Sequence, residues 1–188
     1  MDVMLDLETL STRPEGVILI LGAIKFNPFE IDSFGETLYI RIDVDEQTAK
    51  GRHVCENTMG WWLKQPTDVM EEALSETDRV SISDTLKRLN KFLVGVNNIW
   101  AQGPIFDIGM LENMYRGENT PPPWQHWQIS DSRTLFKTHG DPRVVGRDNL
   151  HNALADCVYQ AQGVQQVYDR LGLQAYTWKN GYTAVSKS

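Results

Sequence analysis

The first part of the chain has the pattern of hydrophobic and polar positions that is typical of β-strands. Residues 3–6 form a short apolar run, and a longer β-prone run covers residues 16–26 after a turn that contains Pro14. Residues 36–43 alternate apolar and polar side chains, which is the two-residue period of a half-buried strand. We therefore predict three adjacent strands, of which the first two pair as a hairpin-like unit.

From residue 57 onward, apolar side chains recur at the three- and four-residue spacings of helices, with short apolar runs between them. We expect helices over residues 57–64, 67–74, 83–93, 105–115, 133–137 and 152–171, and strands over residues 99–101 and 127–129. Three consecutive strands followed by alternating helices and strands predict an α/β fold with an antiparallel and a parallel portion. In such folds, ligand sites lie at the carboxyl ends of the parallel strands.

The composition indicates a single globular domain. Hydrophobic residues make up 41% of the 188 positions, which is enough for one well-packed core. The longest apolar run, residues 17–24, is much shorter than the ~20 residues of a membrane span, and the start at Met1 and Asp2 lacks the features of a secretory signal. We therefore expect a cytoplasmic protein without a membrane partner. Cys55 and Cys157 lie far apart and outside any CxxC pair, so we expect two reduced thiols.

Three acidic residues lie where the predicted strands end. Asp6 and Glu8 are two residues apart on an extended segment, so their side chains point to the same face and are able to share a metal ion. Two surface acids beside a turn explain the same spacing equally well. Asp107 lies in the turn between the strand at 99–101 and the following helix. Taken alone, Asp107 is better explained as a helix N-cap than as a metal ligand.

A histidine and a fourth acid lie near the last predicted helix. His151 and Asp156 are five residues apart, which on one regular helix would set them about 140° apart. They are able to face one site only if His151 lies in the connection that enters the helix. A solvated histidine near a helix start is the simpler alternative. The stretch HNALAD does not match the HExxH pattern of zinc proteases.

The order of these residues along the chain carries more information than any one of them. Residues 6–9 (DLET), a single Asp in the middle of the chain, and residues 151–156 (HNALAD) resemble, in that order, the three motifs of the DEDDh, or DnaQ-like, 3′-5′ exonucleases. The resemblance extends over nearly the whole chain. Residues 103–107 (GPIFD) and 131–135 (DSRTL) are most similar to the phage exonuclease A and RNase AS-like branch.

The resemblance implies an RNase H-like fold, in which a mixed central sheet of about five strands, three antiparallel and then two parallel, is flanked by helices. The exonuclease domain is expected to span residues 1–175, followed by a C-terminal tail at 176–188. The tail is polar, and two alternatives stay open for it. It is either loose or docked on a second copy of the chain in a homodimer.

The resemblance also implies a site for two divalent metal ions. Asp6 would bridge both ions, Glu8 and Asp156 would complete the site for the first, and Asp107 would help to hold the second. Oxygen ligands of this kind suit Mg²⁺ or Mn²⁺ better than zinc. Two such ions stabilise both the attacking and the leaving oxygen of an in-line displacement at phosphorus.

Three further positions receive roles from the resemblance. His151 would act as general base and take the proton from the attacking water, while Thr9 and Leu10 would contact the terminal nucleotide, with Leu10 wedged against its base. The expected partner is the 3′ end of a nucleic acid, and we expect that end to be single-stranded. The choice between DNA and RNA depends on contacts to a 2′-hydroxyl, which the sequence does not reveal.

A net charge of −7 argues at first against a polyanionic partner. Bound divalent cations would reverse the local field at the acidic site, which weakens this argument. The densest basic group is either a phosphate-binding rim or a mixed solvated surface, and it comprises Arg133, Lys137, Arg143 and Arg147. Trp61 and Trp62 point about 100° apart on a helix, so at most one of them offers a surface to a base. Core packing is the preferred interpretation of this pair.

Two other functions remain open. The first is a catalytically silent, nuclease-like module that binds nucleic acid or a partner without cutting it. All five defining positions carry the side chain needed for catalysis, which favours the enzyme. The second is a metal-dependent phosphoesterase acting on small nucleotides, because the sequence does not reveal the depth of the site.

Overall fold

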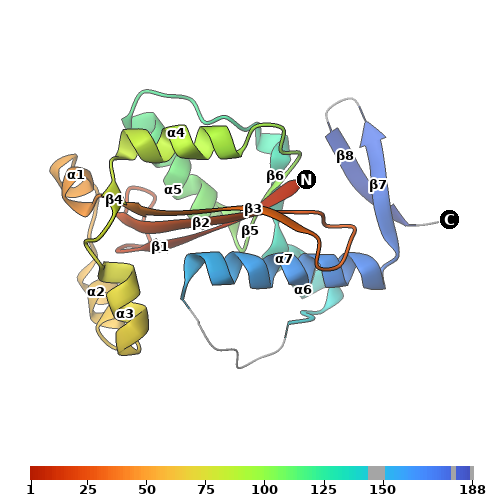
Figure 1. The fold of residues 1–188 in the computed structure, drawn as a ribbon, viewed down its shortest axis with the longest axis horizontal. Coiled ribbons are helices and arrows are strands. Elements are labelled where there is room, and N and C mark those ends of the chain that lie inside the picture. The colour runs from red at the N-terminus through yellow and green to blue at the C-terminus, as the bar shows by residue number, and fades with distance from the viewer. Residues whose placement is uncertain (144–150, 179–180, 187–188) are drawn as a thin grey trace.

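A six-stranded mixed sheet forms the centre of the molecule (Figure 1) in the computed structural model, which describes residues 1–143, 151–178 and 181–186. The strands lie in the order β4-β3-β2-β1-β5-β6. β1, β2 and β3 pair antiparallel, whereas β4 runs parallel to β3, and β5 and β6 run parallel to β1. The bounds are β1 (Asp2–Thr9), β2 (Ile18–Phe26), β3 (Phe34–Ile42), β4 (Arg79–Val80), β5 (Ile99–Ala101) and β6 (Ile129–Asp131). The predicted α/β fold is confirmed, and β4 adds a strand to the expected five.

Helices cover both faces of the sheet (Figure 1). α4 and α5 lie on one face, and α6 and α7 lie on the other, while α1, α2 and α3 gather at one end. Apolar side chains of α4 and α5 pack against one side of β1, and those of α6 and α7 pack against the opposite side. The bounds are α1 (Val44–Ala49), α2 (Glu56–Trp62), α3 (Thr67–Leu74), α4 (Ile82–Phe92), α5 (Pro104–Gly117), α6 (Ser132–His139) and α7 (Ala153–Arg170).

The alternation of side chains along β1 determines which of them face the site. Leu5 and Leu7 belong to the core under α4 and α5, whereas Met4 belongs to the core under α6 and α7. Because successive side chains of a strand point to opposite faces, Asp6 and Glu8 lie on the same face as Met4. The two acids therefore extend from the central strand toward α7.

α7 approaches the sheet very closely at one glycine. A Cβ atom placed on Gly22 of β2 would lie 2.5 Å from the carbonyl carbon of Ala153, the first residue of α7. One turn later, the Sγ atom of Cys157 donates a hydrogen bond of 3.3 Å to the carbonyl oxygen of Gly22. The missing side chain at Gly22 thus brings the first turn of α7 down onto the centre of the sheet.

Several short segments differ from the pattern-based expectation, among them α1 and β4, which the pattern did not predict. Residues 127 and 128, predicted as part of a strand, belong to a 3-10 turn (His126–Gln128), and β6 begins at Ile129. The side chain of Gln128 accepts a hydrogen bond from the backbone N–H of Gln125, which closes this turn. Near the other end of the chain, β7 (Leu173–Trp178) and β8 (Gly181–Ser186) pair antiparallel. The division into a domain and a tail at residue 175 stays a prediction.

Two further features concern the cysteines and the helices. Cys55 and Cys157 are both free thiols. In the part of the chain that the structure describes, no helix is both long enough and apolar enough to cross a membrane.

Candidate active site

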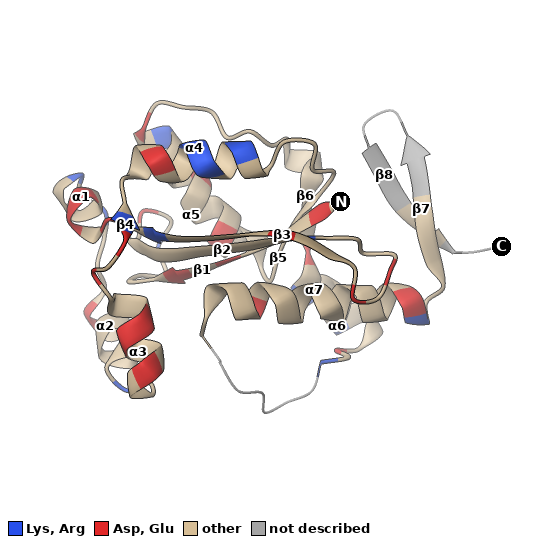
Figure 2. Ribbon diagram, viewed as in Figure 1, with Lys and Arg blue, Asp and Glu red and all other residues tan. Residues whose placement is uncertain are grey.

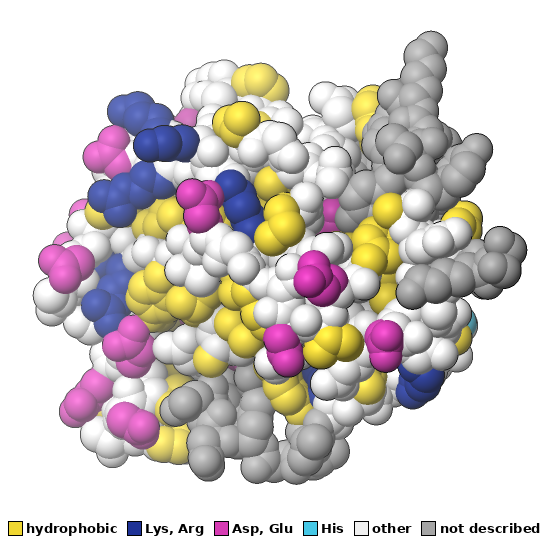
Figure 3. Space-filling model, turned by 45° about the vertical axis from the view of Figure 1, so that its right-hand side comes forward, with side chains coloured by type: hydrophobic (Ala, Val, Ile, Leu, Met, Phe, Trp, Pro, Cys, Tyr) yellow, Lys and Arg dark blue, Asp and Glu magenta, His cyan; other side chains and the backbone are white. Residues whose placement is uncertain are grey.

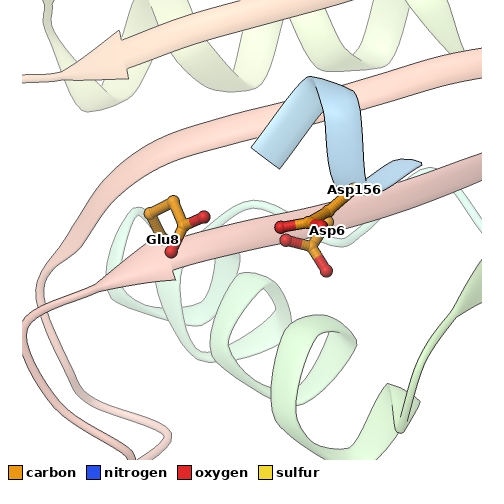
Figure 4. A group of neighbouring side chains, drawn as sticks. All are labelled: Asp6, Glu8 and Asp156. Carbon is orange, nitrogen blue, oxygen red and sulfur yellow. The ribbon is translucent and has the colours of Figure 1, made fainter. Parts of the chain in front are cut away.

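Three acidic side chains that are far apart in sequence converge between β1 and α7. Asp6 and Glu8 come from β1, and Asp156 comes from the first turn of α7 (Figure 4). One carboxylate oxygen of each lies within 4.8 Å of the other two. The structure thus brings together three of the four predicted metal ligands, across 150 positions of the chain.

The start of α7 is fixed by its cap. The side chain of Asn152 accepts a hydrogen bond of 3.0 Å from the backbone N–H of Ala155, and the backbone N–H of Asp156 donates to the carbonyl oxygen of Asn152 at 2.8 Å. Such a cap defines where a helix begins and how its first turn is oriented. The position of the Asp156 carboxylate above β1 follows from this start and from the close approach at Gly22.

Asp107 reaches the site from the opposite side of β1. Its carboxylate accepts a hydrogen bond of 3.2 Å from the backbone N–H of Leu7, which lies between the two acids of β1. The cap of α5 is Gly103, with a φ of 105°, so Asp107 lies in the first helical turn and is not the N-cap. Its side chain is 4% exposed. The N-cap interpretation is therefore wrong, and Asp107 instead contacts the strand that carries Asp6 and Glu8.

One residue at this site was missed by the sequence reasoning. Gln160 lies one helical turn after Asp156 on α7, and its Nε2 atom donates a hydrogen bond of 3.0 Å to Oδ1 of Asp6. The side chain is 5% exposed, and its Oε1 atom has no hydrogen-bond partner among the described residues. The only signal for it in the sequence is its spacing of four residues from Asp156, which places both on one helix face.

The pKa values show that these carboxyl groups are costly to ionise together. Burial, followed by the charges of Asp6 and Asp107, raises the pKa of Glu8 to about 9. Burial also raises the pKa of Asp107 to about 7, against the opposing effects of its backbone hydrogen bonds and of Arg133. Bound cations would favour the ionised forms of both groups. A set of buried and half-buried carboxylates held this close fits hard divalent ions such as Mg²⁺ or Mn²⁺.

His151 lies just before the N-cap of α7, outside the helix. It has a positive φ of 64°, and its ring packs edge to face against Trp61 with 4.8 Å between the ring centroids. This is the arrangement in which a histidine and an acid five residues apart are able to face one site. Its role as general base stays a prediction.

A pocket of about 490 Å³ opens beside Glu8. Trp61 is 40% exposed and lines it, whereas Trp62 is 1% exposed and donates a hydrogen bond of 2.9 Å from Nε1 to the carbonyl oxygen of Thr9. Core packing, the preferred interpretation of the pair, applies to Trp62 alone, and Trp61 offers a surface to the pocket. The pocket is lined by Leu7, Glu8, Thr9, Thr12, Cys55, Asn57, Thr58, Trp61, Trp62 and Phe106.

The two residues expected to contact a nucleotide differ in their surroundings. Thr9 lines the pocket, and its hydroxyl donates a hydrogen bond of 2.8 Å to the carbonyl oxygen of Ser11. Leu10 is buried in the core beside Val17 and Trp62. The roles of Thr9 and Leu10 stay predictions. Asn57, Thr58 and Phe106, which the sequence reasoning did not select, complete the pocket because α2 and the start of α5 flank the end of β1.

The members of the predicted basic group that the structure describes differ in their surroundings. Arg143 forms an ion pair of 2.7 Å with Asp141 and stacks over the ring of Phe136, whereas Lys137 is exposed. Arg133 lines a second pocket near Asp107. Arg147 lies outside the described residues.

The sequence comparison gives the family. Residues 1–168 match the model of the 3′-5′ exoribonuclease Rv2179c-like domain. The chain belongs to this family. The acids of β1, α5 and α7 and the pocket beside them all lie within the matched residues of this domain. A search of curated proteins found no significant match.

Solved nuclease structures share the fold of this exoribonuclease-like domain. Exonuclease X in complex with 5′ overhanging duplex DNA is 15% identical, with a TM-score of 0.54 over 96% of this chain and 95% of that one. The nuclease domain of 3′hExo, a DEDDh family member bound to rAMP, is 12% identical, with a TM-score of 0.55 over 99% of this chain and 96% of that one. The metal-free ExoI–ssDNA complex of E. coli is 15% identical, with a TM-score of 0.60 over 91% of this chain and 42% of that one. These likenesses establish the RNase H-like fold.

Proposed function

We propose that the protein is a metal-dependent 3′-5′ exonuclease of the DEDDh type. The observation that carries this proposal is the convergence of Asp6, Glu8 and Asp156 within 4.8 Å, next to a pocket that opens on Glu8. Membership of the exoribonuclease-like family and the RNase H-like fold agree with it. We assign the chain to the phage exonuclease A and RNase AS-like branch on its GPIFD and DSRTL stretches.

The residues of the site divide into ligands and supports. Asp6, Glu8 and Asp156 would hold the first divalent ion, with Asp6 shared by a second ion that Asp107 helps to hold. When bound, the two ions, Mg²⁺ or Mn²⁺, stabilise the charge that develops on the attacking and leaving oxygens. The Leu7 backbone N–H orients Asp107, and Gln160 orients Asp6, so each carboxylate is fixed before an ion arrives.

His151 would accept the proton of the attacking water. His151 lies in the turn before α7, close in sequence to Asp156 in the first turn of that helix. The contact with Trp61 limits the movement of the His151 ring. A general base of this kind typically contributes ~100- to 10,000-fold to the rate.

The substrate we propose is a single-stranded RNA 3′ end, from which 5′-monophosphates are released. The family description names an exoribonuclease, and the pocket beside Glu8 has the aromatic wall that a base requires, supplied by Trp61. Thr9 would contact the terminal nucleotide from the end of β1, and Leu10 would support it from the core.

The direct test uses 5′-labelled single-stranded RNA, single-stranded DNA and a duplex with a 3′ overhang, each with Mg²⁺, Mn²⁺ or a chelator. We expect a ladder that shortens from the 3′ end only when metal is present. His151→Ala should slow the shortening by ~100- to 10,000-fold, and Asp156→Asn should abolish it. Asp84→Asn on α4 removes an exposed acid outside the site and should leave the rate unchanged.

Two outcomes would contradict the proposal. Tight binding of the RNA without any shortening would favour the catalytically silent module. Hydrolysis of small nucleotide esters without a ladder would favour a phosphoesterase for small nucleotides.

A further inference from the structure

A second pocket, of about 550 Å³, adjoins the first one and shares two of its lining residues, Thr12 and Phe106. The first pocket contains Glu8, and the second continues from it past Phe106 to the start of α5 and Arg133. We propose that the second pocket binds the nucleotide next to the 3′-terminal one, with its base against Ile105 and its phosphate beside Arg133. This inference rests on the proposed exonuclease function.

Part of the lining of the second pocket is apolar. Ile105, the second residue of α5, is 92% exposed, the highest value among the large hydrophobic side chains described. Pro104 and Met110 lie in the same wall. A base of any identity is able to stack on such a surface, because every base has an apolar face. An occupant with a flat, apolar face would remove Ile105 from water.

Arg133 supplies the charge that a phosphate requires. Its guanidinium lies beside Gly103, since a Cβ atom on that glycine would be 2.8 Å from Nη1 of the arginine. None of the ion pairs or side-chain hydrogen bonds between described residues involves this guanidinium. It is therefore available to an anion at the rim of the pocket.

The acid in the same pocket does not compete for this arginine. The carboxylate of Asp131 caps α6, where it accepts hydrogen bonds of 3.0 Å from the backbone N–H of Arg133 and 2.6 Å from the hydroxyl of Thr134. An anion near the guanidinium would replace no existing ion pair. Among the described residues that line the two pockets, Arg133 is the one cation.

The charges on the rest of the molecule favour the position of Arg133 over other places for binding a phosphate. Figure 2 shows basic residues on α4 and acidic residues on α3, and the face in Figure 3 shows separate basic and acidic groups with no continuous basic stripe. With a net charge of −7, the protein would repel a nucleic acid over most of its surface. A cation that lines the second pocket therefore matters more here than it would on a basic protein.

The test compares a strand with a substrate that is unable to reach the second pocket. We measure kcat/KM of the wild type and Ile105→Ser on a 5′-labelled RNA oligonucleotide and on the methyl ester of uridine 5′-monophosphate. The ester fills only the first pocket, because its methyl leaving group is too small to reach Ile105. The serine variant should lose about 10-fold on the oligonucleotide, the effect expected when the burial of one aliphatic side chain is lost, and keep its rate on the ester.

The charge is tested separately, because Arg133 also acts on Asp107. The slope of log kcat/KM against log salt concentration on the oligonucleotide should become shallower by about 0.7 in Arg133→Gln, the change expected when one phosphate contact to a single strand is lost. Lys87→Gln, which removes an exposed cation on α4, should leave the slope unchanged.

Each contrary result has a distinct meaning. If Ile105→Ser loses as much on the ester as on the oligonucleotide, or loses nothing on either, the second pocket does not bind the neighbouring nucleotide, while the exonuclease function stands. An unchanged salt slope in Arg133→Gln overturns the phosphate contact. If the wild type hydrolyses the ester but does not shorten the oligonucleotide, the exonuclease function fails and the inference fails with it.

Discussion

At the scale of single residues, the site depends on acids that are held close together although they repel one another. Burial, together with the charges of Asp6 and Asp107, raises the pKa of Glu8 to about 9, so it takes up a proton at neutral pH unless cations offset the repulsion. Gln160 is the neutral group within this cluster, and its amide donates to Asp6 without adding charge. The amide thus fixes the orientation of the Asp6 carboxylate, as supporting groups around metal ligands typically do.

Gln160→Leu should weaken metal binding without weakening the fold. The substitution removes the hydrogen bond to Asp6 together with a buried oxygen that has no partner among the described residues. Loss of such a supporting group typically lowers metal affinity by ~10- to 100-fold. The measurement is a Mn²⁺ titration followed by electron paramagnetic resonance, with the free energy of unfolding taken from urea denaturation.

A second glutamine on the same helix is the matched control. Gln165 is also buried, but its amide makes hydrogen bonds to the loop before β3, to Asn27, Asp32 and Ser33. Gln165→Leu should lower the free energy of unfolding and leave the Mn²⁺ affinity unchanged. If Gln160→Leu binds Mn²⁺ as tightly as the wild type, the supporting role assigned to Gln160 is wrong.

At this scale, the sequence identifies charged residues better than their supports. The motif order predicts the acids of β1 and α7, and the structure brings them together. Asp107 shows the limit of local patterns, because an Asp at a helix start serves equally well as an N-cap or as a site residue. Only the contact with Leu7 in the structure separates these two roles. Gln160 has no pattern of its own, since an amide on a helix face is usually solvated.

At the scale of elements, the site depends on how closely α7 lies on the sheet. The N-terminal turn of α7 crosses β2 at Gly22, where no side chain separates the two backbones. Asp156 is in that turn, and Asp6 and Glu8 are on the neighbouring strand β1. The separation between helix and sheet therefore sets the separation between the acids.

Gly22→Ala should disturb the fold and the site together. The new methyl group would lie 2.5 Å from the carbonyl carbon and 2.7 Å from the carbonyl oxygen of Ala153, and backbone atoms are unable to rotate away. Overpacking of this kind typically costs about 1–3 kcal/mol. We expect a lower free energy of unfolding in urea and a loss of activity at temperatures where the variant is still folded.

Gly109→Ala on α5 serves as the control for this substitution. Beyond the backbone of its own helix and its two chain neighbours, no atom of the described residues lies within 4 Å of the added Cβ atom, and alanine is favoured over glycine inside a helix by roughly 0.5–1 kcal/mol. This variant should be slightly more stable and fully active. Equal stability and activity of Gly22→Ala and the wild type would show that α7 is free to move outward without cost to the site.

Elements with a clear period are predictable from the sequence, and short ones are not. The alternation in β3 and the apolar face of α7 predict both elements to within a few residues. β4 has two residues, which is too few to show any period, and it becomes a strand only because β3 is beside it. The close contact at Gly22 is also invisible in the sequence, because a glycine in a strand has several possible explanations.

At the scale of the whole molecule, the fold gathers acids from β1, α5 and α7 at one end of the sheet, with two connected pockets beside them. The chain is acidic overall, so its approach to a nucleic acid depends on the charge at this end rather than on a basic surface. Divalent ions held by the four carboxylates, with Arg133 nearby, would make this end attractive to a phosphate backbone.

The most direct test of this account is a crystal of the protein soaked in Mn²⁺, with anomalous diffraction recorded to locate the ions. The account predicts two ions at the end of β1, the first between Asp6, Glu8 and Asp156 and the second shared between Asp6 and Asp107. Asp156→Asn should lose the first ion in the same experiment. Well-ordered carboxylates with no anomalous density between them at saturating Mn²⁺ would contradict the account.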